Sequence, residues 1–348
     1  MRLWRARRQL RSLYRKERKF QTSIKLGRRI QAWRHGFLSE SILVYGREPH
    51  QLSDYLSDFS RYTRTPFINE PYSDFLNNKI LFEASFGACI NVPRNLGLVD
   101  TGRFLTLVKG GSVSTIDTLL EYCRDGTGLV FKPFAGGLGD QLYILLHNDE
   151  TGFWLNGIKT STHELNRLFH EFRMMLCCEY VHQAKYSREI FPETSNTIRV
   201  LTLIDPDSNR SFLAAASHRF GTRRSGAVDN WAGGGLSARI DLLTGELGPA
   251  VVYPMGSPPV VRDDHPDSGS PIKGVTVPGW LAISKRLLEV ANEWSFIPYI
   301  GWDVLVTEEG FQVLEGNNAT GVNLFQVHEP LLRNPRIRRF YQYHNVVD

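Results

Sequence analysis

Two acidic residues near the carboxyl end of the chain are spaced to face each other across a β-hairpin. The segment GWDVLVTEEGFQVLEGNN, residues 301–318, alternates apolar and polar residues on both sides of a Glu-Glu-Gly turn. A three-residue loop with its glycine in the left-handed conformation pairs Thr307 with Phe311. Continuing along the ladder pairs Asp303 with Glu315, and like charges directly opposite each other are unfavourable. A hard divalent cation held by oxygen ligands is the simplest compensation, so the hairpin predicts a metal site.

A lysine followed by glycines forms a second group that could bind an anion. In GLVFKPFAGGLGD, residues 128–140, an apolar strand ends at Lys132, and a loop with Gly136, Gly137 and Gly139 follows. Glycines let backbone N–H groups approach a phosphate, and a lysine supplies a point charge. The segment is neither a Walker A loop nor the dinucleotide fingerprint, which a helix must follow. These residues alone favour a phosphate loop and a plain glycine-rich hairpin about equally.

Two arginines on neighbouring expected strands are further candidates. Arg199 lies within NTIRVLTL and Arg219 near the end of the next strand, in ASHRFG. Each belongs either to a buried ion pair or to a clamp on a phosphate. No Ser/His/Asp or Cys/His constellation is recognisable, and we expect His182 and His218 to lie on strand surfaces.

The elements that must position these residues indicate a mixed architecture. Helices are expected at 38–60, 74–88, about 162–172 and 280–293, and a surface loop at 257–275. Strands are expected at 129–134, 174–181, 197–204, 212–219 and 237–242, with hairpins at 141–155 and in the acidic segment. Runs of strands with inserted helices favour an α+β fold over a doubly wound parallel sheet.

Composition is that of an ordinary globular protein. The chain has 348 residues, of which 42% are hydrophobic and 22% charged, and this length suggests about two domains. No segment approaches the ~20 uninterrupted apolar residues of a membrane span. The four cysteines show no metal-binding spacing, so we expect buried thiols in a reducing compartment and no zinc.

The positive charge is concentrated at the amino end. Residues 1–35 hold thirteen Lys or Arg and one acid, a balance of +12, so the rest of the chain carries −7 of the total of +5. Apolar residues recur there at helical spacing, which predicts a basic amphipathic helix. The helix either docks on anionic lipid or an acidic partner, or packs as a solvated helix on the body. Nucleic acid is not expected, because the body is acidic and has no known binding motif.

Taken in order, these motifs resemble the ATP-grasp superfamily, and within it the sugar-transfer-associated ATP-grasp family, over roughly residues 36–340. The matching segments are NNKILFEASFGACINVP, LVFKPFAGGLGD, CCEYVHQ, SNTIRVLTL, AVDNWAGGG and GWDVLVTEEGFQVLEGNN. The resemblance implies an ATP-grasp fold, with a basic helical region at 1–74 and two α+β subdomains at 75–182 and 183–348 that clamp ATP.

The resemblance also assigns roles to individual residues. Lys79 and Lys132 match the two lysines that contact ATP phosphates, although without this match a surface lysine of a helix is the preferred interpretation of Lys79. Gly136, Gly137 and Gly139 match the loop that closes over the phosphates, and Glu179, Tyr180 and Val181 match the hinge that binds adenine. Asp303, Glu315 and Asn317 match the ligands of Mg²⁺, with two ions expected and Mn²⁺ as an alternative. Arg199 and Arg219, with Lys132, are expected to act on the transferred phosphate, which favours the clamp.

The chain departs from the best-known relatives in ways that leave its acceptor open. The D-alanine–D-alanine ligases carry an arginine just before the first metal aspartate, where this chain has Gly301 and Trp302. Their ribose-binding glutamate aligns near Thr197. Arg223 and Arg224 are expected on a mobile loop, and Asn230 with the adjacent glycines is a candidate cradle for a substrate carboxylate or an acyl phosphate.

The resemblance implies an ATP-dependent carboxylate–amine ligase that forms an acyl phosphate, in polysaccharide or glycoconjugate assembly. Its substrates are then a small-molecule or glycan carboxylate and an amine acceptor. Two alternatives stay open, an ATP-dependent kinase of a sugar or related molecule and a non-catalytic nucleotide-binding partner of a glycosyltransferase complex. A cytoplasmic location is expected, either free or at the inner face of the membrane through the basic helix.

Overall fold

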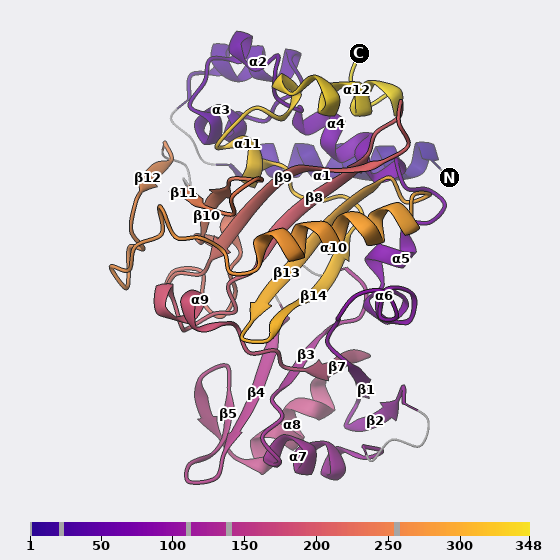
Figure 1. Ribbon diagram of the computed structural model, residues 1–348, viewed down its shortest axis with the longest axis vertical. Helices are drawn as coiled ribbons and strands as arrows, with labels where there is room; N and C mark the ends of the chain where they lie inside the picture. Colours follow the sequence, from indigo (N-terminus) through magenta and orange to yellow (C-terminus); the bar gives the residue numbers. More distant parts are fainter. Residues whose placement is uncertain (1, 21–23, 109–112, 137–140, 254–257) are drawn as a thin grey trace.

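The computed structural model of the protein describes residues 2–20, 24–108, 113–136, 141–253 and 258–348 (Figure 1). The α-helices of this part of the chain are α1 (Arg2–Lys19), α2 (Leu26–Arg34), α3 (Ser39–Tyr45), α4 (Asp58–Thr63), α5 (Asp74–Asn77), α6 (Lys79–Phe86), α7 (Ile116–Arg124), α8 (Thr162–Glu171), α9 (Lys185–Ile190), α10 (Trp280–Glu293), α11 (Asn323–Gln326) and α12 (Pro335–Tyr343). Short 3₁₀ turns occur at Pro49–Gln51, Thr65–Phe67, Trp231–Gly233 and Leu331–Arg333. None of these helices combines the length and apolar character needed to cross a membrane.

The strands form two separate antiparallel sheets. The first has the order β2-β1-β7-β3-β4-β5-β6 and consists of β1 (Asn95–Asp100), β2 (Arg103–Thr106), β3 (Leu129–Pro133), β4 (Tyr143–Asn148), β5 (Gly152–Leu155), β6 (Ile158–Thr160) and β7 (Met175–Glu179). The second has the order β12-β11-β10-β9-β8-β13-β14 and consists of β8 (Ile198–Ile204), β9 (Ser211–Phe220), β10 (Leu236–Ile240), β11 (Leu247–Val252), β12 (Val260–Arg262), β13 (Tyr299–Thr307) and β14 (Gly310–Asn317). Two antiparallel sheets with helices on their faces confirm the α+β class.

The first sheet buries one face against α7 and α8. Leu119 and Cys123 of α7 and Phe169 of α8 pack on Phe131 and Cys177 of the sheet. Both helices begin with the capping box that their sequences contain, Thr115 to Thr118 and Ser161 to Glu164. These caps fix where α7 and α8 begin.

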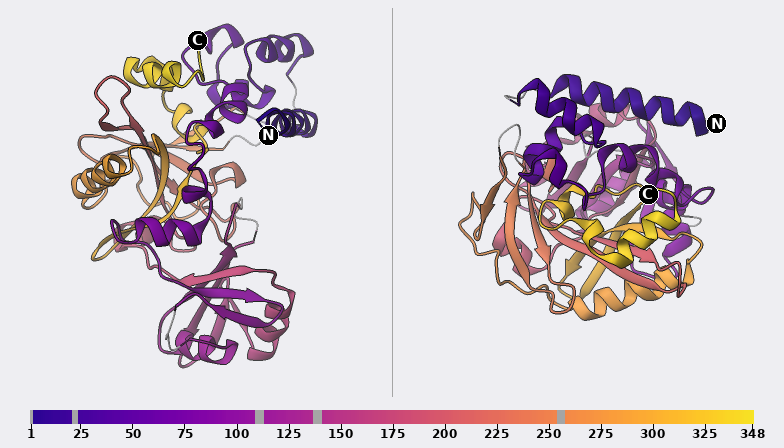
Figure 2. Two further views of the ribbon diagram at one scale, coloured as in Figure 1. Left: turned by 90° about the vertical axis from the view of Figure 1, so that its right-hand side faces the viewer. Right: turned by 90° about the horizontal axis from the view of Figure 1, so that it is seen from above.

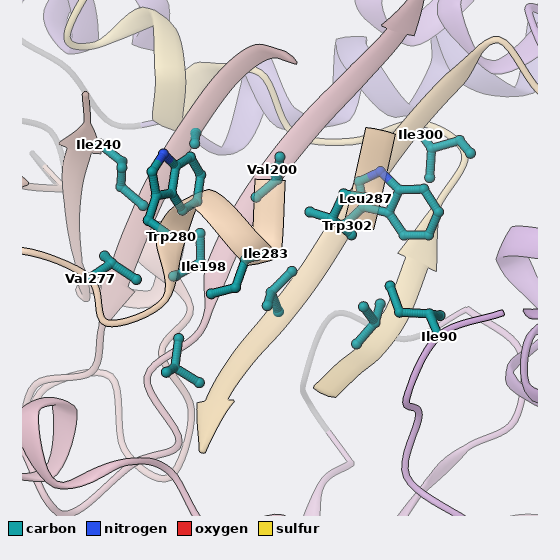
Figure 3. Packing of buried hydrophobic residues seen from close by; sticks show 14 of the residues in the cluster. Ile90, Ile198, Val200, Ile240, Val277, Trp280, Ile283, Leu287, Ile300 and Trp302 are labelled. Atoms are coloured by element: carbon teal, nitrogen blue, oxygen red, sulfur yellow. The ribbon is translucent and has the colours of Figure 1, made fainter. Parts of the chain in front are cut away.

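The second sheet is covered on both faces, and its central strands β8 and β13 are buried along almost their whole length. On one face, Trp280, Ile283 and Leu287 of α10 pack against Ile198 and neighbouring apolar side chains (Figure 3). On the other face, Leu201 and Leu203 pack against the amino-terminal helices, α11 and α12. Because side chains alternate along a strand, Arg199 points to this second face.

The two sheets are stacked along the long axis of the molecule. The first sheet forms the lower lobe in Figure 1, and the second lies at the centre with the amino-terminal helices and α12 above it. Figure 2 shows α10 on one side of the central sheet and the amino-terminal helices on the opposite side. The junction between the sheets is where the predicted site residues lie.

Several sequence expectations were wrong in detail. The helix expected at 74–88 is broken at Asn78, which is extended (φ −108°, ψ 114°) and caps α6 by accepting from Ile80 and Leu81 N–H groups. The helix expected at 38–60 is α3, a 3₁₀ turn and the start of α4, because Gly46 ends α3 in the left-handed conformation. The loop expected at 257–275 contains the edge strand β12, whose three residues are too few to show the alternation of apolar and polar side chains that is typical of a strand. Strands β1, β2, β6 and β11 were not predicted.

Candidate active site

The β13–β14 hairpin places Asp303 opposite Glu315, as the sequence predicts, but through a different ladder. Thr307 pairs with Gly310 rather than with Phe311, since the turn has two residues and not three. A one-residue shift beyond Val304 leaves Leu314 as the extra residue and restores the predicted pair. A bulge of this kind redirects side chains at the end of a strand.

Asp303 is buried and is held by two arginines from neighbouring strands. Arg199 on β8 donates from Nε to Oδ1 and from Nη2 to Oδ2 of Asp303, the latter at 2.9 Å. Arg219 on β9 donates from Nη2 to the same Oδ2 at 3.0 Å. Arg219 also pairs with Asp229, whose Oδ2 lies 3.4 Å from its Nε. The site therefore contains a buried chain of alternating charges.

Burial and pairing act in opposite directions on these groups. Burial would raise the pKa of Asp303, but Arg199 and Arg219 outweigh it and leave the pKa below its ordinary value. Burial would lower the pKa of Arg219, yet the acids around it, Asp229 first, raise it overall. For Asp229 burial dominates and the pKa is raised, although Arg219 opposes the change. Asp303 consequently stays ionised at neutral pH.

Lys79 connects the metal-site strand to the glycine loop. Its Nζ lies 3.1 Å from Glu315 Oε2 and donates to the Gly136 carbonyl at 3.1 Å. Its backbone N–H donates to the Phe134 carbonyl at 2.8 Å, which fixes the start of α6 against the loop. The Lys79 side chain is only 12% exposed, so the alternative of a surface lysine is wrong. The break at Asn78 makes this placement possible.

Lys132 lies at the end of β3, on the sheet face opposite α7 and α8. β3 pairs with β7 so that Lys132 stands across from Leu176 and two positions from the Val130–Cys178 pair. Burial raises the pKa of the Cys178 thiol, while Lys132 and Lys79 both act to lower it. Lys79 and Lys132 therefore both lie near Cys178 of β7.

The hinge residues follow β7 directly. Tyr180 N–H donates to the Gly128 carbonyl at 2.7 Å, and the Glu179 carboxylate accepts from the Tyr122 hydroxyl of α7. The Glu179 side chain thus points to the α7 face, away from Lys132. The Val181 N–H makes no hydrogen bond to another residue that the structure describes.

The structure shows fewer contacts for the remaining candidates, which are the loop glycines, Arg223, Arg224 and Asn230. Gly136 has a φ of 67°, while Gly137 and Gly139 lie outside the described residues. Arg223 and Arg224 are exposed between β9 and β10. Asn230 accepts from Ala232 N–H and caps a 3₁₀ turn.

The expectation for His218 was wrong. His182 is exposed as expected, but it follows the end of β7 instead of lying on a strand. His218 is completely buried on β9 and lies 2.9 Å from the Tyr186 hydroxyl. Burial lowers the pKa of His218 to about 3, so this imidazole is neutral and structural.

Sequence reasoning missed the residues that hold the arginines. Thr320 accepts from Arg199 Nη1 at 2.6 Å, and Thr197 accepts from Arg219 Nε at 3.1 Å. A Cβ on Gly301 would lie 2.5 Å from Thr320 Cβ, so a larger side chain cannot stand there. The positive charge beside Asp303 therefore comes from Arg199 on β8 and Arg219 on β9, and the sheet pairing brings both to this carboxylate.

The donor set suits a hard cation that arrives together with phosphates. Two carboxylates and the Asn317 amide lie at one end of the hairpin, and Asn317 Nδ2 is 3.4 Å from Asp303 Oδ1. Within the described residues no three His, Cys, Asp or Glu side chains gather into a metal site. Mg²⁺ accepts one or two carboxylates when phosphate and water oxygens complete its shell. Asp303, Glu315 and Asn317 therefore fit Mg²⁺ bound with a nucleotide.

Fold and site together define an ATP-grasp protein, and sequence comparison identifies the family. The model of the sugar-transfer associated ATP-grasp family matches residues 60–339. The chain therefore belongs to this family. No curated protein matches the chain in sequence.

Several solved structures are similar at low identity. D-alanine–D-alanine ligase from Bacillus anthracis is 12% identical with a TM-score of 0.38, over 78% of this chain and 69% of that chain. The macrocyclase MdnC from Microcystis aeruginosa MRC, bound with the precursor peptide MdnA, is 13% identical with a TM-score of 0.41, over 79% and 65%. The ADP complex of purK, an N5-carboxyaminoimidazole ribonucleotide synthetase, is 8% identical with a TM-score of 0.39, over 71% and 46%. The chain thus spans less than half of that last protein.

Proposed function

We propose that the protein is an ADP-forming carboxylate–amine ligase that uses Mg·ATP. The observation that carries the proposal is the position of Lys79, which contacts both Glu315 on the central sheet and the Gly136 carbonyl beside β3. Because Lys79 contacts both subdomains at this point, its ammonium group can contact the phosphates of a nucleotide bound between them. The name of the family supports a substrate in glycan assembly, such as a sugar acid to be coupled to an amino acid.

The charges of the site suit a triphosphate better than a free metal ion. Lys79, Lys132, Arg199 and Arg219 are matched by three acids, Glu315, Asp303 and Asp229, so these side chains are net positive by one. An anionic nucleotide is attracted to such a site, whereas a divalent cation alone is not. When bound with ATP, Mg²⁺ would supply charge neutralisation at the phosphates, held by Asp303, Glu315 and Asn317.

The proposed reaction has two steps. A substrate carboxylate oxygen forms a bond to the γ-phosphorus while the bond from that phosphorus to the β,γ-bridging oxygen breaks, giving an acyl phosphate and ADP. The neutral amine then forms a bond to the acyl carbon, phosphate leaves, and the amine loses a proton. Lys79, Lys132 and Arg199 neutralise charge on the phosphates during the first step. No protein nucleophile is required.

The test is ADP release with Mg·ATP and paired carboxylates and amines, with hydroxylamine as a trap. A ligase gives amine-dependent ADP and phosphate, and hydroxylamine converts the acyl phosphate to a hydroxamate. ADP release that yields a stable phosphorylated product without an amine would establish the kinase instead. If no carboxylate supports ADP release although Mg·ATP binds, the proposal fails in favour of the non-catalytic alternative.

A matched pair of variants on the same hairpin links the activity to the site. Glu315→Gln removes a proposed metal ligand, and we expect ADP release to fall by roughly 100-fold or more. Glu309→Gln changes an exposed acid in the β13–β14 turn and should leave the rate unchanged. Equal rates for the two variants would remove Glu315 from the reaction.

A further inference from the structure

Between Gln9 and Lys19, where the side chains of α1 are described, the exposed ones are basic, polar or apolar and none is acidic. Leu13 and Glu17 face the body and are buried, while Leu10 and Tyr14 are 44% and 63% exposed. Arg11, Arg15, Arg18 and Lys19 are exposed on the side of α1 that lies opposite Leu13 and Glu17. Leu10 lies beside Glu17 around the helix but is exposed. The only acid among residues 1–35, Glu17, is thus turned away from solvent.

Helix α2 exposes an apolar stripe at helical spacing. Leu26, Ile30 and Trp33 are separated by four and three residues and are 63%, 38% and 41% exposed. Residues at this spacing share one face of a helix. The buried residue of α2 is Ala32, so the helix packs on the body through a small side chain and turns its larger apolar side chains outward.

The two helices are held together and to the body by specific contacts. Arg29 of α2 donates to Glu17 of α1 at 2.7 Å, and the Glu17 carboxylate also accepts from Ser39 N–H at 2.9 Å. Lys16 donates to the Tyr62 hydroxyl of α4. In the left panel of Figure 2, α1 and α2 lie along the same edge of the molecule. We call the exposed residues of this edge, Leu10, Arg11, Tyr14, Arg15, Arg18, Lys19, Lys25, Leu26, Ile30, Trp33 and Arg34, the α1–α2 face.

We infer that the α1–α2 face binds the surface of an anionic lipid membrane. Exposed apolar and aromatic side chains beside arginines and lysines are what an interfacial helix uses to insert into a headgroup layer. Residues 36–348 carry a net charge of −7, so an anionic surface repels this part of the chain and attracts the edge formed by α1 and α2. The charge asymmetry therefore favours an anionic membrane and also orients the protein with the α1–α2 face toward it.

A membrane explains the apolar stripe better than an acidic protein or solvent does. Acidic protein surfaces would pair with the arginines but would not require Leu26, Ile30 and Trp33 to be exposed together. A purely solvated helix would turn these side chains inward. The α1–α2 face lies on the same side of the central sheet as Arg199 and Asp303, opposite α10 (Figure 2), so docking would turn this side toward the lipid.

Vesicle flotation of the full chain tests the inference. We expect binding to phosphatidylcholine vesicles that contain phosphatidylglycerol, weaker binding at high salt, and little binding to phosphatidylcholine alone. Replacing both Arg11 and Arg15 by glutamate should lower the partition coefficient at least about 25-fold. Leu26→Ser with Trp33→Ser should lower it about tenfold or more.

Matched controls lie on α10, on the far side of the sheet. Leu281→Ser and Lys285→Glu change side chains that are 68% and 79% exposed there, and both should bind vesicles like the natural chain. Stabilisation by Mg·ATP should be unchanged in all four variants, which shows that each is folded. The inference is overturned if the protein does not bind anionic vesicles, if it binds neutral vesicles equally well, or if the α10 controls lose binding to the same extent. Binding to an acidic protein in the absence of vesicle binding would also overturn it.

Discussion

Asp303 accepts hydrogen bonds from Arg199 and Arg219 at a position where only 5% of the residue is exposed. Removing one partner from a buried ion pair leaves uncompensated charge, which costs more than the pair itself contributes. The same carboxylate is a proposed metal ligand. Stability and activity are therefore coupled at this residue.

Asp303→Asn should lower both the free energy of unfolding and the rate. We expect a loss of about 3–5 kcal/mol on unfolding, because two buried guanidinium groups lose a charged acceptor. Denaturant unfolding measures it, with Asp263→Asn as a control, since Asp263 pairs with Lys273 on the surface and should change stability by less than about 0.5 kcal/mol. Asp303→Asn with the stability of the natural chain would mean that the pair is not buried as described.

His218 should make the fold sensitive to acid. Its pKa is about 3 when folded and about 6.5 when unfolded, so between these values only the unfolded chain binds the proton. Stability from this group is full above pH 6.5 and is lost as pH falls, with a slope of about 1.4 kcal/mol per pH unit. We expect His218→Gln to reduce the measured slope between pH 6 and pH 4, and the exposed His182→Gln to leave it unchanged. Identical slopes would show that His218 is accessible to protons.

At the scale of elements, close packing of α5 and α6 on β14 positions Lys79. Gly316 lies between Glu315 and Asn317, and a Cβ there would be 2.8 Å from both Leu76 Cδ2 and Phe82 Cε2. These two side chains belong to α5 and α6. A glycine at this point lets the helix that carries Lys79 approach the strand that carries its acidic partner.

Gly316→Ala should therefore separate Lys79 from Glu315. Overpacking of this kind costs about 1–3 kcal/mol, and we expect a lower melting temperature together with weaker Mg·ATP binding by calorimetry. Gly248→Ala is the control, because its Cβ would meet nothing closer than 3.7 Å. Unchanged nucleotide affinity in Gly316→Ala would mean that the α6 position does not govern the site.

At the scale of the whole molecule, the two sheets meet at a site with a small excess of positive charge. Mg²⁺ alone should give little stabilisation, ATP with a chelator somewhat more, and Mg·ATP the most. Ligand at 100 times its dissociation constant stabilises the folded state by about 2.7 kcal/mol. Thermal unfolding under the three conditions measures this order, and stabilisation by Mg²⁺ alone equal to that by Mg·ATP would contradict it.

Local patterns in the sequence determined much of this protein. The capping box at Ser161, the alternation of β13 and β14, and the spacing of Lys132 to its glycines depend on neighbouring residues. They can therefore be recognised without knowing the fold. The same holds for the basic amino-terminal helix, because charge and helical spacing are local properties.

Tertiary structure alone decided which groups meet. Asp303 faces Glu315 only because a bulge at Leu314 compensates for a turn that is one residue shorter than predicted. From the sequence, a short turn with a bulge cannot be distinguished from a longer turn with a regular ladder, because both give the same pair. Asp229, Thr197 and Thr320 join the site through pairing among strands distant in sequence. His218 was expected on a surface because alternation shows which side chains share a face but not whether a second layer covers that face. Burial and cross-strand partners depend on packing between distant segments, which no local pattern encodes.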